Sequence, residues 1–273
     1  MLKRMNKDIL FKIVIGMFVI ILAGFILLTI CSVLKRSLPY LLESLMDAEI
    51  QFAIKMTLYT STIATLISLI FAIPIAYGLA KFEFYGKGII SGIIQIPNSI
   101  PPIASGIALL LLFSNEKMSI LLNKLHLDPV FSVKGIILAH FFINAPYMIR
   151  IIRTTFEDIN PKLEFISRTL GYGSFGTFFK VSIPLARNGL ITAIIITWTN
   201  TLGEFGTALM LAGSIRMKTE TLPVAIFLNL SGGNLDKALA AATILIIISI
   251  IGLITFEFMC KAQFKRDRIY LKK

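Results

Sequence analysis

Long apolar stretches constrain this chain more than any other feature of its sequence. Six mainly apolar segments occur, at about 11–34, 52–80, 88–113, 133–152, 187–213 and 237–260. A helix needs about 20 apolar residues to cross the ~30 Å hydrocarbon core of a bilayer. Because 56% of the residues are hydrophobic and only 15% are charged, a soluble domain of this length could not bury them all. The sequence therefore predicts an all-α membrane protein with about six transmembrane helices.

The distribution of Lys and Arg predicts how these helices are oriented. The net charge is +12, and about two thirds of the 27 Lys and Arg residues lie in the N-terminal segment, the 81–87 loop, the 150–187 loop and the C-terminal tail. Cytoplasmic loops carry such an excess, so we expect both termini in the cytoplasm and a location in the inner or plasma membrane. We attribute the positive charge to this topology and not to nucleic-acid binding.

The third apolar segment contains a cluster of prolines. Pro97, Pro101 and Pro102 lie within six residues, next to Asn98. Proline removes a backbone donor and clashes with the preceding helical turn. A broken helix is tolerated in lipid only where protein or a water-filled cavity covers the freed backbone. We expect 97–102 to face the bundle interior and to line a pathway, with a simple kink as the alternative.

The long cytoplasmic loop 153–186 carries the signals of a short amphipathic helix. Asn160 can cap the helix, Pro161 suits its first position, and Gly171 can end it. Ser174 can then cap a second segment. An apolar stripe is formed at helical spacing by Leu163, Ile166 and Leu170. Such a helix suits either docking into a partner's groove or resting on lipid head groups, and the residues alone leave both possibilities open.

This loop resembles the EAA loop of ATP-binding-cassette (ABC) importer permeases. Gly171, followed after nine residues by Val181-Ser-Ile183-Pro184, fits the family pattern, whereas Phe165-Ile-Ser167 replaces its Glu-Ala-Ala. Glu164 lies one residue earlier. The resemblance implies that the helix at about 161–171 docks on a cytoplasmic ATPase. The coupling residues that it implies are Leu163, Glu164, Ile166, Arg168, Gly171 and Pro184.

The likeness extends over about 50–260 and narrows to one branch of the family. Three further motifs are similar to the molybdate, tungstate and sulfate branch: Pro97-x-x-x-Pro101-Pro102-x-x-x-Gly106, Thr201-Leu-Gly203-Glu204-Phe205-Gly206 and Lys218-Thr-Glu220-Thr-Leu-Pro223. They look most like molybdate permeases. The resemblance implies a MetI-like type I permease bundle that carries molybdate or tungstate, with sulfate or thiosulfate as the alternative. The path or gate residues that we assign are Pro97, Asn98, Pro101, Pro102, Asn200, Gly203, Glu204, Phe205 and Gly206.

Glu204 is the only acidic residue deep in an apolar segment. A carboxylate near the bilayer centre costs at least about 2.5 kcal/mol, so it should face protein or water. An ionised carboxylate would also repel an oxyanion. We therefore expect a role in gating or helix packing, with a hydrogen bond to a group such as Asn200. Gly203 and Gly206 beside it allow close helix approach.

The expected domains and partners follow from these readings. Residues 1–50 form an N-terminal span and outer loop, 51–260 the permease domain, and 261–273 a basic cytoplasmic tail. The chain has no phosphate-binding G-x-x-x-x-G-K-[ST] motif, so we expect no catalytic residues, metal or cofactor here, and ATP and Mg on a separate ATPase. The expected partners are two ATPase subunits, an extracytoplasmic oxyanion-binding protein, a second copy in a homodimer with the pore on its two-fold axis, and membrane lipid.

Two other classes of protein are less consistent with the sequence. A secondary transporter should show paired broken helices and ionisable groups within the membrane, and the break at 97–102 has no clear counterpart. A membrane enzyme would need a cluster of catalytic or metal-binding residues, and the two histidines lie on different segments.

Overall fold

The computed structural model describes residues 2–124 and 127–270, and every regular element within these ranges is helical, as predicted. The element η1 is a 3-10 helix and η2 is a π-helix. The bounds are α1 (Leu2–Met46), α2 (Ala48–Lys81), α3 (Lys87–Gln95), η1 (Ile96–Asn98), α4 (Pro102–Phe113), α5 (Glu116–Lys124), α6 (Val133–Glu157), α7 (Pro161–Thr169), α8 (Ser174–Thr177), η2 (Phe178–Ser182), α9 (Ile183–Leu202), α10 (Gly206–Ala212), α11 (Leu222–Ser231) and α12 (Leu235–Tyr270).

Six spans can be identified within the described residues, in the predicted order. Five are single helical stretches long and apolar enough to cross a membrane, namely α1, α2, α6, Ser174–Leu202 and α12. The sixth is a bent pair, Lys87–Asn98 with α4, whose two halves differ in direction by 107°. Large apolar side chains of α1, among them Phe18, Ile20 and Leu28, are mostly exposed, which is stable only where lipid solvates them. The chain is a multi-pass membrane protein.

The proline cluster breaks the third span, as predicted. The chain leaves α3 through η1, and Pro101 has a ψ of 137°, outside the helical range. Pro102 then occupies the first position of α4. A residue that precedes proline is disfavoured in the helical conformation, whereas proline itself suits a helix start. The third span is therefore two short helices and not one kinked helix.

A second break divides the span expected at 187–213. α9 ends at Leu202, and α10 begins at Gly206 after three non-helical residues. No proline causes this break, so the sequence does not predict it. The helical stretch also begins earlier than expected, because α8 and the π-helix η2 continue directly into α9.

The regions between the apolar segments, 35–50 and 214–236, are largely helical. α1 continues past Pro39 to Met46, which takes it well into the 35–50 region. The 214–236 region contains α11, which contacts α12 and α2 and buries Leu222, Val224 and Ala225. A further short helix, α5, lies between the third and fourth apolar segments.

Among the described residues, a large cluster of buried apolar side chains lies mainly between α2, α6 and α9. Its small residues, such as Ala72, Ala76 and Ala186, let the helix backbones approach closely. Tyr77 lies edge-to-face against Phe156 and Phe178, with ring centroids 5.3 and 4.6 Å apart. This aromatic cluster joins the ends of α2 and α6 to η2, and thus anchors the segment that follows α7.

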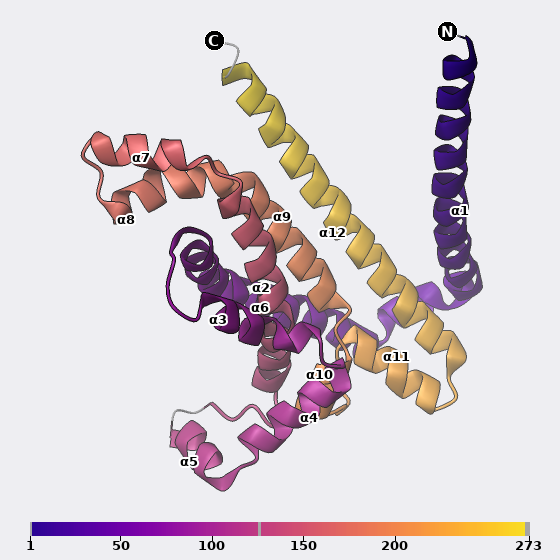
Figure 1. Cartoon of the computed structure of the whole chain (residues 1–273). Coiled ribbons are helices and arrows are strands. Elements are labelled where there is room, and N and C mark those ends of the chain that lie inside the picture. Colours follow the sequence, from indigo (N-terminus) through magenta and orange to yellow (C-terminus); the bar gives the residue numbers. More distant parts are fainter. Residues whose placement is uncertain (1, 125–126, 271–273) are drawn as a thin grey trace.

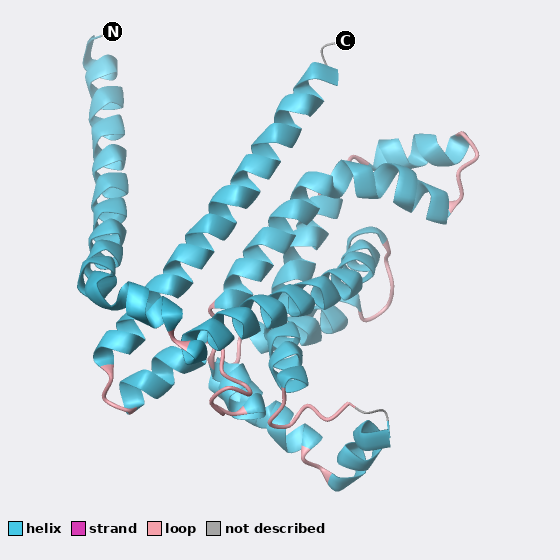
Figure 2. Cartoon of the chain, turned by 180° about the vertical axis from the view of Figure 1, so that it is seen from behind, coloured by secondary structure: helices cyan, strands magenta, loops and turns pink. Residues whose placement is uncertain are grey.

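The two ends of the molecule carry different elements. Both termini and the α7–α8 segment lie at one end, whereas α4, α5 and α11 lie at the other (Figures 1 and 2). The shared end agrees with the charge-based expectation that the termini and the 150–187 loop lie on one side of the membrane. α1 stands apart from the bundle over much of its length and meets α12, where the hydroxyls of Ser37 and Thr243 lie 2.6 Å apart.

Candidate functional site

α7 has the local structure that its sequence predicts. The Asn160 side chain caps the helix by accepting a hydrogen bond from the backbone N–H of Lys162 at 3.0 Å. Pro161 takes the first helical position. After the helix, Gly171 adopts a φ of +91°, a left-handed conformation that favours glycine. The second segment starts differently from expectation, because Gly173 and not Ser174 is the N-cap residue of α8.

The apolar face of α7 points away from the protein. Leu163, Ile166 and Leu170 are 43%, 52% and 74% exposed. These residues line a groove of about 370 Å³ together with Ser167, Tyr172, Lys180, Val181, Pro184 and Leu185. The groove thus brings the predicted residues Leu163, Ile166 and Pro184 together. An apolar stripe that its own chain leaves uncovered indicates a surface for another molecule.

The polar face of α7 points into the protein. The Glu164 carboxylate is buried, with Oε1 accepting a hydrogen bond from Ser182 Oγ at 2.7 Å and Oε2 3.4 Å from Lys81 Nζ. We call Lys81, Glu164 and Ser182 the α7 joint. One turn further on, the hydroxyls of Ser167 and Thr177 lie 3.1 Å apart. Glu164 therefore holds α7 to its own chain and does not belong to the exposed stripe.

Arg168, the remaining predicted coupling residue, is exposed beside a separate hollow. This hollow has a volume of about 470 Å³ and is lined by Ala80, Lys81, Phe82, Glu157, Pro161, Glu164, Arg168 and Ser174. Its lining mixes positive and negative side chains. The predicted coupling residues therefore divide between an apolar groove on one side of α7 and a charged hollow on the other.

The two broken spans meet where α4 crosses α10. Thr207 Oγ1 donates a hydrogen bond of 2.9 Å to the carbonyl oxygen of Pro102. The helices are so close that a Cβ added at Gly106 would lie 2.7 Å from the Thr207 carbonyl oxygen, and one at Gly206 would lie 3.0 Å from Pro102 Cβ. We call this contact the α4–α10 crossing. The break in the third span thus has a counterpart, contrary to the expectation from sequence.

Glu204 has a different partner from the one expected. Its Oε1 accepts the backbone N–H of Thr207 at 2.9 Å and so caps α10. Asn200, the expected partner, lies on the exposed face of α9. A carboxylate at a helix N-terminus satisfies a free N–H and is favoured by the helix dipole. This position accounts for an acidic residue inside an apolar span.

Asn98 belongs to a polar chain that ties the third span to α6. Asn98 Nδ2 donates to Gln95 Oε1 at 2.9 Å, and Gln95 Nε2 donates to the Pro146 carbonyl oxygen at 3.2 Å. The predicted path residues differ in exposure. Pro101, Pro102, Asn200 and Gly203 are exposed, whereas Pro97, Asn98, Glu204, Phe205 and Gly206 are partly buried.

Sequence reasoning did not identify three residues that organise these sites. Lys81 and Ser182 hold Glu164, and Thr207 joins the two breaks. Lys81 offers a weak signal, since it is the basic last residue of a long helix. Ser182 and Thr207 offer none, because hydroxyl residues are common in membrane helices. Within the described residues, no group of three or more His, Cys, Asp or Glu could hold a metal ion.

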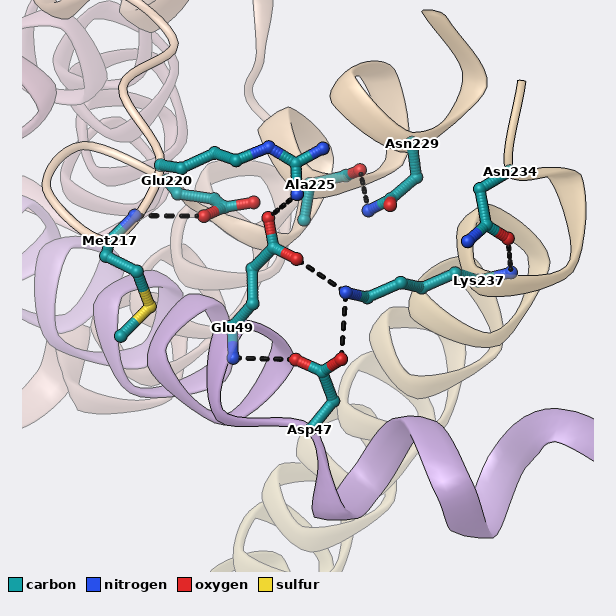
Figure 3. A network of polar contacts seen from close by, with 9 residues as sticks. Asp47, Glu49, Met217, Glu220, Ala225, Asn229, Asn234 and Lys237 are labelled. Carbon is teal, nitrogen blue, oxygen red and sulfur yellow. Dashed lines mark hydrogen bonds and ion pairs between the residues drawn. The ribbon is translucent and has the colours of Figure 1, made fainter. Parts of the chain in front are cut away.

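At the end of the molecule opposite α7, an ion network joins three segments (Figure 3). Asp47 caps α2 by accepting the N–H of Glu49 at 2.8 Å and lies 2.8 Å from Lys237 Nζ. Glu49 pairs with both Lys237 and Arg216. Nearby, the Glu220 side chain is fully buried and accepts the Met217 N–H at 3.1 Å. Burial raises the pKa of the Glu220 carboxyl above its usual value, a shift that the Met217 N–H, Arg216 and Lys237 partly offset.

Comparison with known sequences finds relatives that are all membrane components of transport systems. Residues 64–266 match the family model described as "Binding-protein-dependent transport system inner membrane component". The chain is 32% identical to the molybdate/tungstate transport system permease protein WtpB of Methanocaldococcus jannaschii, covering 88% of this chain and 93% of that protein. It is 31% identical to the molybdenum transport system permease protein ModB of Haemophilus influenzae, with coverage of 78% and 95%. The sulfate transport system permease protein CysW of Synechocystis is 27% identical, with coverage of 80% and 79%.

Solved structures show the same fold at lower sequence identity. A chain of a bacterial alginate ABC transporter, solved with an alginate pentasaccharide-bound periplasmic protein, matches with a TM-score of 0.74 at 17% identity, covering 94% of this chain and 96% of that one. A chain of an inward-facing MetNI methionine ABC transporter matches with a TM-score of 0.65 at 18% identity, with coverage of 80% and 97%. At these identities the likeness concerns the fold alone.

Proposed function

The chain belongs to the family of binding-protein-dependent transport system inner membrane components, and from this premise we propose that it forms the translocation path of an ATP-driven importer for molybdate or tungstate. The proposal for the cargo is supported by the relatives, since proteins named for molybdate or tungstate transport match most of this chain. Sulfate or thiosulfate is the alternative cargo, because sulfate permeases match nearly as well. Lys and Arg are absent from the centres of the apolar spans, which suits a conduit that holds an anion weakly.

The observation that carries the proposal is the orientation of α7. This helix exposes Leu163, Ile166 and Leu170 at the end of the molecule where both termini lie. We assign that end to the cytoplasm on the basis of its Lys and Arg residues. An apolar stripe facing water is stabilised when a partner buries it, as in helix-in-groove recognition. The partner that we assign is an ABC ATPase subunit, which binds ATP and Mg and supplies the hydrolysis.

The path itself is assigned to a face that a single chain leaves open. Pro101 and Pro102 of the third span and Asn200 and Gly203 of the fifth are exposed. Two copies related by a two-fold axis would bring these residues to the same central face. Two ATPase subunits would then engage two copies of α7, and a binding protein on the other side of the membrane would deliver the oxyanion.

One observation favours a secondary transporter as the second candidate. The broken spans that meet at the α4–α10 crossing have the pattern of discontinuous helices in such proteins. Ion coupling, however, also requires ionisable groups free to bind and release ions. Glu204, the acidic residue at this site, is engaged in capping α10. We therefore rank this function below the importer.

The test of docking is co-purification of the ATPase from native membranes. The double variant Leu163→Asp and Leu170→Asp places two charges in the exposed stripe and should abolish co-purification of the ATPase. The chain should stay folded, because neither side chain is buried. Tyr85→Asp is the control, because Tyr85 is fully exposed in another loop. ATP hydrolysis by the parent complex with molybdate, tungstate or sulfate and the corresponding binding protein then identifies the cargo. If the parent chain purifies without an ATPase even after cross-linking, the importer function is wrong.

A further inference from the structure

The buried contacts between α7 and the rest of the chain are polar. Only Glu164 and Ser167 are buried among the residues of this helix. Glu164 contacts Ser182 at the end of η2 and Lys81 at the end of α2. Lys81 Nζ also donates to the Ile159 carbonyl oxygen at 3.3 Å, just before α7 begins. The α7 joint therefore connects three elements at one carboxylate.

Such a connection differs physically from an apolar contact. Hydrophobic association is non-directional, so by itself it does not fix the geometry between two particular groups. A charge-assisted hydrogen bond has a fixed geometry and is roughly twice as strong as a neutral one. Because the Lys81 and Glu164 side chains are only 12% and 10% exposed, removing the Lys81 ammonium would leave the Glu164 charge mostly buried with no cation paired to it in the joint. A displacement of α7 must therefore move Lys81 and Ser182 with it or break the joint.

α2 extends the reach of this joint to the opposite end of the molecule. The helix has 34 residues, which corresponds to a length of about 50 Å. Lys81 ends the helix, and near its start Glu49 pairs with Arg216 and Lys237 (Figure 3). Arg216 lies in the loop that follows α10, and Lys237 lies in the first turn of α12. α2 thus connects α7 physically to the segment beyond the α4–α10 crossing.

We propose that the α7 joint transmits displacements of α7 to α2, in addition to the chain connection that runs through Pro184 to α9. Lys81 and Ser182 are then positioning residues for transport, and they contact neither the ATPase nor the cargo. This inference rests on the proposed function, because it takes α7 as the helix on which the ATPase acts. It adds a second route from α7 to the gate region. This route runs through side-chain contacts to α2, whereas the first follows the chain itself into α9.

The experiment uses the complex that co-purifies with the parent chain, reconstituted in proteoliposomes with the binding protein and the oxyanion that stimulates hydrolysis. Lys81→Met keeps the apolar length of the side chain and removes its charge, and Ser182→Ala removes the hydrogen bond to Oε1. Both complexes should retain the ATPase and its hydrolysis, while oxyanion imported per ATP falls by about tenfold. Lys81→Arg, which keeps the charge, should restore import per ATP. The control is Lys87→Met, whose partner Glu83 is 89% exposed at its side chain.

Three outcomes decide between the possibilities. Hydrolysis without import in Lys81→Met and Ser182→Ala, with recovery in Lys81→Arg, supports the transmission role. Normal import per ATP in both variants overturns it and leaves the importer function intact. Loss of the ATPase from both variants also overturns it, because the joint would then serve only to shape the docking surface. A parent chain that binds no ATPase is a separate result, which refutes the proposed function itself.

Discussion

Glu220 is a buried carboxyl group in the loop that precedes α11. Its Oε2 accepts one backbone N–H, whereas its Oε1 is buried without a hydrogen-bond partner among the described residues. The charged groups around it are Arg216, Lys237 and Asp47. Burial disfavours the ionised form, so the pKa of Glu220 is raised above the usual 4.5. The folded chain therefore binds a proton at this site more readily than the unfolded chain does.

This shift predicts how stability depends on pH. A carboxyl whose folded-state pKa is raised contributes stability that is fully present below its unfolded pKa and lost as the pH rises through the folded pKa. We expect Glu220→Gln, which is neutral at all pH values, to be stabilised relative to the parent at neutral pH. This advantage should shrink as the pH falls towards the unfolded value of 4.5. Thermal unfolding of the detergent-solubilised chain across this pH range measures the difference.

A matched variant controls for the change in net charge. Glu116→Gln removes one negative charge from the exposed surface of α5 without changing a buried group. Its melting temperature should follow that of the parent across the same pH range. An advantage of Glu220→Gln that stays constant with pH would contradict the assignment of this pH dependence to Glu220.

Among the helices, the two broken spans stabilise each other. A broken helix in a membrane must satisfy the backbone groups that it frees. At the α4–α10 crossing, the Thr207 hydroxyl donates to the Pro102 carbonyl, and the Glu204 carboxylate accepts the Thr207 N–H. Thr207 of α10 thus donates one hydrogen bond to a residue of its own break and one to a residue of the other break. The two breaks form one structural unit, although about 100 residues separate them in the chain.

Removing the Thr207 hydroxyl should destabilise the α4–α10 crossing. Thr207 is fully buried, so Thr207→Val keeps its shape and leaves the Pro102 carbonyl without this donor. Hydrogen bonds between membrane helices are worth about 0.6 kcal/mol on average and up to about 1.7 kcal/mol. We expect a loss of stability in that range, measured by unfolding in mixed detergent. Thr207→Ser keeps the hydroxyl, so its free energy of unfolding should fall less than that of Thr207→Val. An equal loss of stability in the two variants would show that the hydrogen bond contributes nothing.

For the whole molecule, the exposed face around the breaks decides how the chain assembles. Pro101, Pro102, Asn200 and Gly203 are exposed at or beside the two breaks, and Ile103 is half-exposed. A polar residue such as Asn200 is costly against lipid, so this face is better covered by protein or by a water-filled path. A second copy of the chain related by two-fold symmetry would cover these residues with protein and enclose a water-filled path between the two copies.

We therefore predict a complex of two permease chains and two ATPase subunits, with Gly203 close to the symmetry axis. Native mass spectrometry of the purified complex measures the stoichiometry. In a background in which Cys31 and Cys260 are replaced by serine, Gly203→Cys should give covalent permease dimers with a short bifunctional maleimide. The cysteine-free parent controls for other reactions of the reagent. A single permease chain in the complex would refute this arrangement.

Several features of this protein are determined by the sequence through short-range physics. The six spans follow from apolar segments that only lipid can solvate. The break in the third span follows from proline, which lacks the donor that a helix needs. The start and end of α7 follow from Asn160, Pro161 and Gly171, whose effects reach only a few residues along the chain. The motifs of the long cytoplasmic loop, together with those at 97–106, 201–206 and 218–223, identified the family.

Other features depend on partners that are distant in sequence, so only the tertiary structure decided them. The break at 203–205 carries no proline and is stabilised by contact with α4. Glu164 points inward because Lys81 and Ser182 lie behind α7, whereas the family resemblance grouped it with the coupling residues. α11 is too short to span a membrane and is stabilised by its burial against α2 and α12. Local signals act along a helix, but the direction in which a polar side chain points depends on which neighbours can satisfy its hydrogen bonds and charge.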